Sequence, residues 1–242
     1  MMRLTAALAA TSTFLYVTAG AAQGPAHAPD GGTREQIVSI FIPPMANAPF
    51  SAVVTTEWVR HFDTGAVQTL RNHRLVARDG EGRIFQERRF LVPDDTNGSR
   101  LTQTEIADPA QRRLYVCHPD QRSCELHPYN GSVLPPPLMP AGPNLVREEL
   151  GPNVVSGVAT VGTRETTTLN AGAFGNDKPV SVTKEFWYSK ELGVNVLTKR
   201  DDPRSGLQTL TVTNIALADP DPALFHPPAD AKIVGARGSS QP

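Results

Sequence analysis

The chain has 242 residues, of which 39% are hydrophobic and 19% are charged. There are 23 lysine and arginine residues against 24 aspartate and glutamate residues, which gives a formal net charge of −1 at pH 7. A chain of this length and composition can form one sizeable hydrophobic core, and it lacks the basic excess that nucleic-acid binding requires.

The N-terminal segment 1–22 has the layout of a secretory signal peptide. Arg3 precedes an apolar run that extends to about Val17, and small residues follow up to Ala22. A positive start, a short apolar middle and small residues before the cleavage point are the features that signal peptides share. The apolar run is too short for a stable membrane anchor. We therefore predict a periplasmic or secreted protein whose signal peptide is removed near Ala21 or Ala22.

The rest of the chain divides into a lead-in, one domain and a short tail. Residues 23–46 are expected to be a flexible lead-in, because Gly, Ala and Pro dominate its start and Pro43-Pro44 ends its apolar stretch QIVSIFI. A single β-rich domain is expected over 47–234 and a disordered tail over 235–242. Within the domain, segment 134–143 (LPPPLMPAGP) is too rich in proline to join a sheet. We interpret it as a stiff connecting loop rather than a docking segment for a partner.

Alternating hydrophobicity predicts strands from about residue 51 onward. In AVVTTEWVRHF, Val54, Trp58 and Phe62 share one parity while Glu57 and His61 take the other, which is the two-residue period of a strand. Next come two extended runs joined by DGEG, whose glycines allow the positive φ values of a tight hairpin. Later runs are rich in Thr and Val, and none has the apolar repeat of a long helix. The predicted class is all-β to β-rich α+β, with antiparallel pairing.

The stretch CHPDQRSCELH contains the two cysteines of the chain. If the turn lies at PDQR, Cys117 faces Cys124 across a hairpin, within disulfide reach. His118 and His127 then lie on the opposite face and about 13 Å apart. A zinc ion needs all its ligands within about 2.3 Å, and a redox-active pair needs a lowered thiol pKa that this C-x6-C spacing does not provide. In an exported protein the pair is therefore predicted to form a structural disulfide, with no metal.

No catalytic motif is found in the sequence. It has no G-x-S-x-G elbow, no phosphate-binding loop and no H-E-x-x-H. The histidines of the domain are scattered singly, at positions 61, 73, 118, 127 and 226. We assign no catalytic residue and no cofactor.

Four stretches of the chain carry a resemblance to known proteins. They are NAPFSAVVTTEW, NHRLVARDGEGRIFQERR, EFWYSKELGVNVLTKRDDPRSG with TNIAL, and DPALFHPPADAKI. The chain from about Asn47 to Val234 resembles uncharacterised exported bacterial proteins and, more distantly, the periplasmic lipoprotein-carrier and lipid-binding half-barrel superfamily. The closer resemblance implies no activity. The distant one implies a strongly curved antiparallel sheet, capped by helices, whose concave face shelters acyl chains or a lipoprotein tail.

The resemblance and the pattern together give the expected function. We expect a single strongly curved antiparallel sheet, a half-barrel, with few short helices, since no amphipathic helix rich enough for a lid is found. Phe186 and Tyr188 point to one face of a strand and Trp187 points to the other, so both faces carry large aromatic rings. A sheet that is apolar on both faces must be covered on both faces by other parts of the chain or by a ligand. With so little helix, part of the concave face is expected to remain an apolar groove lined by Trp58, Phe62 and Phe186.

The expected protein is therefore a non-enzymatic cell-envelope protein. It would bind a lipid-like or lipoprotein ligand, or a protein partner, on the curved sheet. No nucleic-acid partner and no transmembrane segment after the signal peptide are expected. Two alternatives stay open: a structural envelope protein without a small ligand, and an unrecognised hydrolase among the scattered His and Asp residues.

Overall fold

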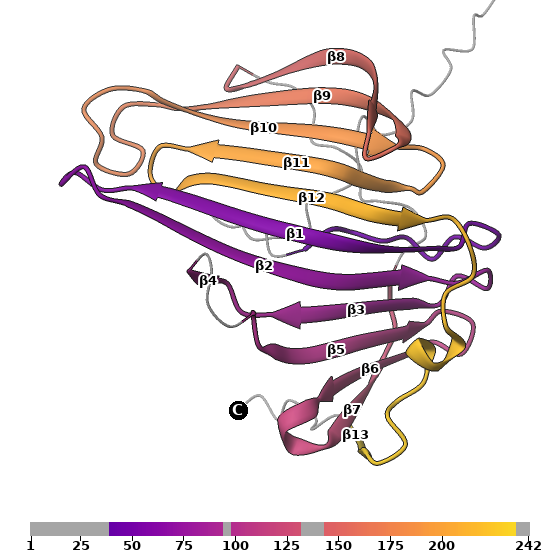
Figure 1. Cartoon of the computed structure of the whole chain (residues 1–242). Helices are drawn as coiled ribbons and strands as arrows, with labels where there is room; N and C mark the ends of the chain where they lie inside the picture. The colour runs from indigo at the N-terminus through magenta and orange to yellow at the C-terminus, as the bar shows by residue number, and fades with distance from the viewer. Residues whose placement is uncertain (1–38, 94–97, 132–142, 236–242) are drawn as a thin grey trace, which may run out of the picture.

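A computed structural model describes residues 39–93, 98–131 and 143–235. They form one large curved sheet of 13 strands, so the predicted half-barrel class is confirmed (Figure 1). The strand order is β13-β7-β6-β5-β3-β2-β1-β12-β11-β10-β9-β8, with β4 beside β2. The predicted signal peptide, most of the lead-in, all but the end of the proline-rich loop and most of the tail lie outside the described residues.

The strands and the short 3-10 helices alternate with tight turns along the chain. Their bounds are β1 (Phe50–His61), β2 (Val67–Arg78), β3 (Ile84–Arg89), β4 (Val92–Pro93), β5 (Leu101–Asp108), β6 (Arg113–His118), η1 (Pro119–Gln121), β7 (Ser123–Pro128), β8 (Leu145–Val155), β9 (Val158–Leu169), β10 (Val180–Ser189), β11 (Val194–Asp202), β12 (Gly206–Ala216), η2 (Pro222–Phe225) and β13 (Lys232–Gly235). All pairs are antiparallel except β13 with β7, so the prediction of a purely antiparallel sheet needs this one correction. The long connection between β12 and β13 allows this parallel pairing, which a tight hairpin turn does not.

The register assigns each side chain to one of two faces, because successive side chains of a strand point in opposite directions. We call the face that carries Phe50, Val54 and Trp58 the inner face. It bears the main core cluster of the protein. Buried members of this cluster from the strands include Phe50, Ala52, Val54, Val76, Ile84, Ala107, Val194, Val196, Leu210 and Val212.

The outer face is polar over one half of the sheet. Directly paired residues alternate in charge from β8 to β11, where Glu148 faces Arg164, Arg164 faces Glu185 and Glu185 faces Lys199. Arg164 lies 3.1 Å from Glu185 and 3.7 Å from Glu148, and Arg71 pairs with Glu57 farther along the sheet. Cross-strand pairs of opposite charge stabilise a sheet modestly and suit a surface that faces water.

A second core cluster covers the outer face of the other half. Its buried members are Ala77, Phe85, Ile106, Cys117, Cys124 and Phe225. Phe225 belongs to η2, which lies on the viewer's side of the sheet in Figure 1 and contacts β3 and β5. The side chain of Asp221 caps η2 by accepting from the Ala223 N–H at 2.9 Å. The C-terminal segment therefore covers the apolar outer surface that no long helix covers among the described residues.

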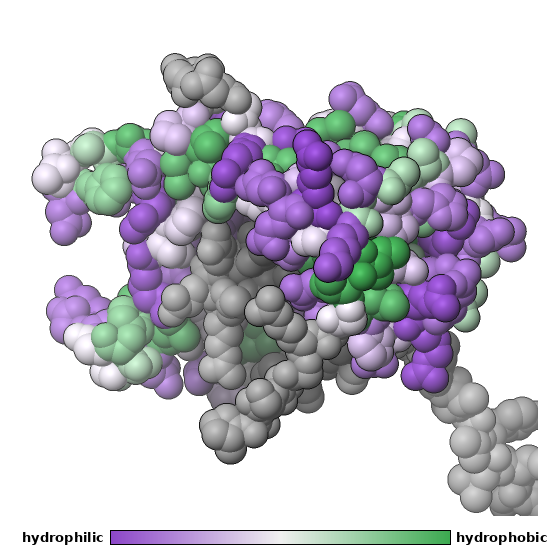
Figure 2. All heavy atoms as spheres, turned by 90° about the horizontal axis from the view of Figure 1, so that it is seen from below, coloured by the Kyte–Doolittle hydropathy of each residue, from purple (hydrophilic) through white to green (hydrophobic). Residues whose placement is uncertain are grey.

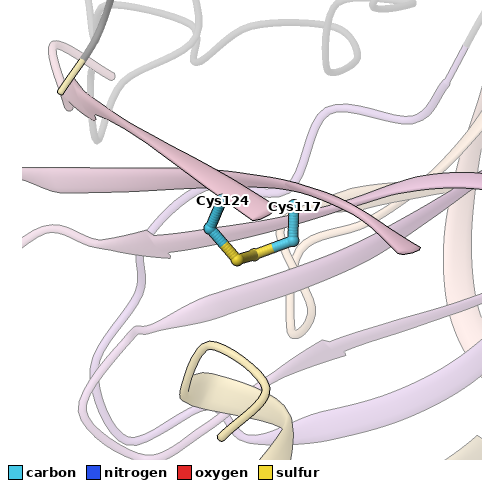
Figure 3. The surroundings of a disulfide bond; sticks show 2 residues. All are labelled: Cys117 and Cys124. Atoms are coloured by element: carbon cyan, nitrogen blue, oxygen red, sulfur yellow. A yellow bond between two sulfur atoms is a disulfide. The ribbon is translucent and has the colours of Figure 1, made fainter. Parts of the chain in front are cut away.

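The predicted disulfide is confirmed. Cys117 on β6 pairs directly with Cys124 on β7, their Cα atoms lie 3.9 Å apart, and the two sulfurs are bonded (Figure 3). The turn is η1, and it closes on Arg122, which has a φ of 46°. Asp and Pro open the turn as the sequence indicated, so the register follows from local turn chemistry.

Residues 39–49 form a strap across the inner face. Ile40 and Ile42 are 5% and 3% exposed and belong to the main core cluster. Arg78, fully buried on β2, donates from Nε to the Ala48 carbonyl at 2.8 Å and from Nη1 to the Pro43 carbonyl at 2.9 Å. The packed domain therefore includes residues 39–46, which the sequence placed in a flexible lead-in. Pro43 and Pro44 lack the N–H that pairing in a sheet requires, so the strap forms no strand. The strap is buried nevertheless, because Arg78 donates hydrogen bonds to two of its backbone carbonyls.

Candidate functional site

The inner face is the candidate binding surface, because the sheet is curved (Figure 1) and a cavity is lined by residues of this face. Figure 2 shows patches of hydrophobic residues among hydrophilic ones on the side seen from below. Two cavities include residues of this face, one between β2, β3 and β5 and the other at the β11–β12 turn. The first, which we call the arginine pocket, has a volume of about 400 Å³ and is lined by Asn72, Arg74, Arg88, Arg89, Thr102, Gln103 and Glu105. The second has a volume of about 340 Å³ and lies at the turn between β11 and β12, beside the end of β1.

Phe62 and Arg60 line the second cavity, and Trp58 lies next to Arg60. The guanidinium of Arg60 lies 5.2 Å from the Trp58 ring centroid and 5.5 Å from that of Phe62. Trp58 is half-buried, and its Nε1 donates to the Ser205 carbonyl at 2.7 Å, whereas Phe62 is 41% exposed. A cation over two aromatic faces holds the rings in place at a partly wet edge. These two residues thus form the rim of the inner face.

Phe186 lies in the floor of the same face. The register places Phe186 opposite Thr198, Thr198 opposite Leu210 and Leu210 opposite Thr56. Thr56 and Trp58 share a parity on β1, so Phe186 and Trp58 are on one face of the sheet. Phe186 is only 1% exposed. The three aromatic residues named from the sequence therefore share a face, two at its rim and one in its core.

The arginine pocket was not named from the sequence. Arg88 donates twice to Glu105, at 3.0 and 2.7 Å, and Arg89 is paired with Glu87 at 2.8 Å. Arg74 is 2% exposed and reaches hydroxyl groups, Ser39 Oγ and Thr56 Oγ1, each at 3.3 Å. Burial, with a smaller effect of the nearby Arg88 charge, lowers the pKa of Arg74 to about 10. The pocket is therefore cationic. The signal for it in the sequence was that Arg74 shares the parity of the apolar Val76 on β2, so both side chains point to the inner face.

Catalytic and metal-binding arrangements are few in the described residues. No three His, Cys, Asp or Glu side chains among residues 39–93, 98–131 and 143–235 come together as metal ligands. Thr55 Oγ1 and His73 Nδ1 lie 2.9 Å apart, which is the geometry of a hydroxyl with a base. They are a directly opposed, solvent-exposed pair on the outer face, away from the candidate binding surface. In the part of the chain that the structure describes, no helix is long and apolar enough to cross a membrane.

Comparisons with known proteins give likenesses of fold. No protein-family model matches the chain, and no curated protein matches it in sequence. The MucA/MucB complex of Pseudomonas aeruginosa aligns with a TM-score of 0.40 and 12% identity, over 77% of this chain and 58% of that chain. This chain therefore spans less than two thirds of that neighbour.

Two further structures align along most of their own length. An uncharacterized conserved protein from Thermus thermophilus has a TM-score of 0.41 and 12% identity, over 78% of this chain and 91% of that chain. A LolA superfamily protein from Nitrosomonas europaea has a TM-score of 0.31 and 11% identity, over 75% of this chain and 91% of that chain. The structural neighbours thus include a LolA superfamily protein, as the distant resemblance in the sequence led us to expect.

Proposed function

We propose that this chain is an exported, non-enzymatic protein of the cell envelope that binds a lipid-like ligand on the inner face of its curved sheet. The supporting observation is the difference between the two faces. The inner face has an apolar centre, which the strap covers, and a cavity with a polar lining beside it, whereas the outer face is charged over one half and covered by the C-terminal segment over the other. Ligand sites are typically concave and mostly apolar, with a few polar groups that fix orientation.

The location and the absence of catalysis rest on separate observations. The Cys117–Cys124 disulfide supports export, because such bonds persist in oxidising compartments. The signal-peptide layout of residues 1–22 supports it independently. The position of Thr55 and His73 argues against a hydrolase, because both face solvent on the outer face. A catalytic pair needs a cavity that holds the substrate. The arginine pocket and the cavity between the β2–β3 turn and η2 are not lined by Thr55 or His73.

Titration with a fluorescent fatty-acid analogue tests the proposal. We expect the native protein to bind it, and Trp58→Ala to weaken binding by about tenfold or more, since a buried aromatic ring contributes roughly 1.5–3 kcal/mol. Phe186→Leu is the matching change in the floor of the face, chosen over alanine because a large cavity at a residue that is 1% exposed would threaten the fold. Trp187→Ala is the control, since Trp187 lies on the outer face, where its Nε1 donates to Glu185 at 2.8 Å.

The titration results distinguish the claim that a lipid binds from the claim that these residues bind it. No binding by the native protein refutes the lipid ligand. Unchanged binding in folded Trp58→Ala and Phe186→Leu variants removes these residues from the site and leaves the ligand. Phe62→Ala tests the exposed part of the rim in the same way.

A protein partner is the second candidate, and the edge of the sheet favours it. Strand β8 ends the sheet and pairs only with β9 among the described strands. It exposes Val146 and Val154 at 57% and 67%. An extended segment of a partner could add to such an edge by main-chain hydrogen bonds. Native mass spectrometry of the protein isolated from its own envelope would show a lipid adduct, a protein adduct or neither, and the last result would support a structural role.

A further inference from the structure

We propose that the arginine pocket binds an anionic head group, so that the ligand is an anionic amphiphile and not a neutral lipid. The proposal rests on the proposed function for the apolar tail and on the pocket for the charge. Arg74 and Arg88 are the residues assigned to bind the head group.

The first observation is a set of buried polar atoms at this pocket. Arg74 Nε, Arg88 Nη1 and Asn72 Oδ1 are buried and have no hydrogen-bond partner among the described residues. The other groups of these side chains are engaged, since Asn72 Nδ2 donates to the Arg89 carbonyl at 2.9 Å and Arg88 is bidentate to Glu105. Buried donors are nearly always satisfied, and charged ones are the most costly to leave unmet. Arg74 and Arg88 line one cavity, so the oxygens of one anionic group can accept from both of these donors, whereas Asn72 Oδ1 is an acceptor and is not met by an anion.

The second observation is the charge of the pocket. Arg88 is balanced by Glu105, and Arg89 by Glu87. No carboxylate of the described residues forms an ion pair with Arg74, which contacts hydroxyl groups only. Glu105 and Glu87 attract Arg74 without contacting it, and an anion in direct contact would reduce the cost of burying this cation further. The guanidinium group presents parallel donors that match the oxygens of a carboxylate or a phosphate.

The third observation places the tail. Arg74 is directly opposite Val54, and Asn72 is directly opposite Thr56. Thr56 is opposite Leu210 on its other side, and Trp58 is the next residue of β1 on the same face. A head group in the pocket therefore lies on the same face as Trp58, next to the apolar centre that the strap covers. The tail is expected to extend along β1 toward Trp58 and the rim.

Three probes with the same twelve-carbon tail test the head group: dodecanoate, dodecyl phosphate and dodecanol. Affinities would be measured by calorimetry with the whole protein. We expect the native protein to bind an anionic probe about tenfold or more tightly than dodecanol. Comparing dodecanoate with dodecyl phosphate distinguishes a carboxylate head group from a phosphate. Equal affinity for all three probes would overturn the proposal and leave the proposed function standing.

Variants connect the selectivity to the pocket. Arg74→Met keeps the volume and removes the buried charge, a change that is often neutral for stability. It should abolish the preference for the anion and leave dodecanol binding unchanged. Arg113→Met removes an exposed arginine outside the pocket and should preserve the preference. A preference that survives Arg74→Met in a protein with native circular dichroism would overturn the assignment.

A separate measurement covers the case in which the native protein binds none of the tailed probes. That result would refute the proposed function, and the pocket would then be tested with acetate and inorganic phosphate alone. We expect either anion to shift the Nε–Hε NMR signal of Arg74 in the native protein. No shift with either anion would overturn the anion site as well.

Discussion

Replacement of Asp202 by asparagine tests how the end of β11 is stabilised. Asp202 is 1% exposed, and its carboxylate accepts from Arg200 Nη2 at 3.2 Å and from Arg204 Nη2 at 2.7 Å. Arg200 is itself 2% exposed. Asparagine keeps the size of the side chain and removes the negative charge. The buried Arg200 cation then loses this carboxylate, and the unfolding free energy should fall.

The pKa of Asp202 gives the size of the effect. Burial alone would raise this pKa, but hydrogen bonds from Arg204 and Arg200 outweigh burial and lower the pKa from 3.8 to about 2. A difference of this size corresponds to about 2.4 kcal/mol in favour of the ionised, folded state. Because the folded-state pKa lies below the unfolded-state value, the contribution is complete above about pH 5. It is lost as the pH falls from about 4 toward 2.

Urea unfolding of the native protein and of Asp202→Asn measures this contribution. Tryptophan fluorescence is a suitable signal, because Trp58 donates to the Ser205 carbonyl in the same turn. We expect the two proteins to differ by about 2 kcal/mol at pH 7 and by less than about 1 kcal/mol near pH 2.5. Asp201→Asn is the control, since Asp201 is exposed and should show little difference at either pH. A difference that is as large at pH 2.5 as at pH 7 would refute the electrostatic explanation.

Three further predictions concern the covalent and packed features of the chain. Replacing Cys117 and Cys124 by serine should lower the unfolding free energy by at most about 2.5 kcal/mol, because the loop that the bond closes is short; two free thiols in freshly isolated protein would contradict the bond. Arg78→Met should cost about 3 kcal/mol by removing the charge-assisted hydrogen bonds to the Ala48 and Pro43 carbonyls, of which the Pro43 carbonyl keeps the Met45 amide at 2.9 Å. Hydrogen exchange at the Asn47 amide should accelerate, and unchanged protection there would show that the strap does not depend on Arg78. N-terminal sequencing of protein from its host should begin after residue 21 or 22, and an intact first methionine would be incompatible with signal removal.

Local features of the fold could be predicted from the sequence because short-range chemistry determines them. The two-residue period of β1 and the glycines after Asp79 each act within a few residues. Asp79 accepts from the Glu81 and Arg83 amides at 3.0 and 2.8 Å, which closes the β2–β3 turn as the motif indicated. The Cys117–Cys124 register followed from the turn between the two cysteines in the same way.

Burial of the strap could not be predicted, because it depends on partners far away in the sequence. The stretch QIVSIFI gives no period, and the prolines after it end any regular element. Its packing depends on Arg78, 35 residues after Pro43, and on the curvature that brings β2 beneath the strap. The same reasoning explains why the sequence grouped Trp58 and Phe62 by parity but could not place Phe186 in the core.

Two arginines on β2 show how one residue type serves two purposes on the inner face. Arg78 and Arg74 lie four residues apart on the same face, and burial lowers the pKa of each to about 10. Arg78 has backbone carbonyls of the strap at 2.8 and 2.9 Å, so it is bound to the fold itself. Arg78 Nη2 and Arg74 Nε both lack a hydrogen-bond partner among the described residues, but Arg74 has only hydroxyl contacts at 3.3 Å and lines a cavity. A charge held in place by its neighbours but not satisfied by them favours an anion from outside the chain, and this difference is why Arg74 and not Arg78 is assigned to the ligand.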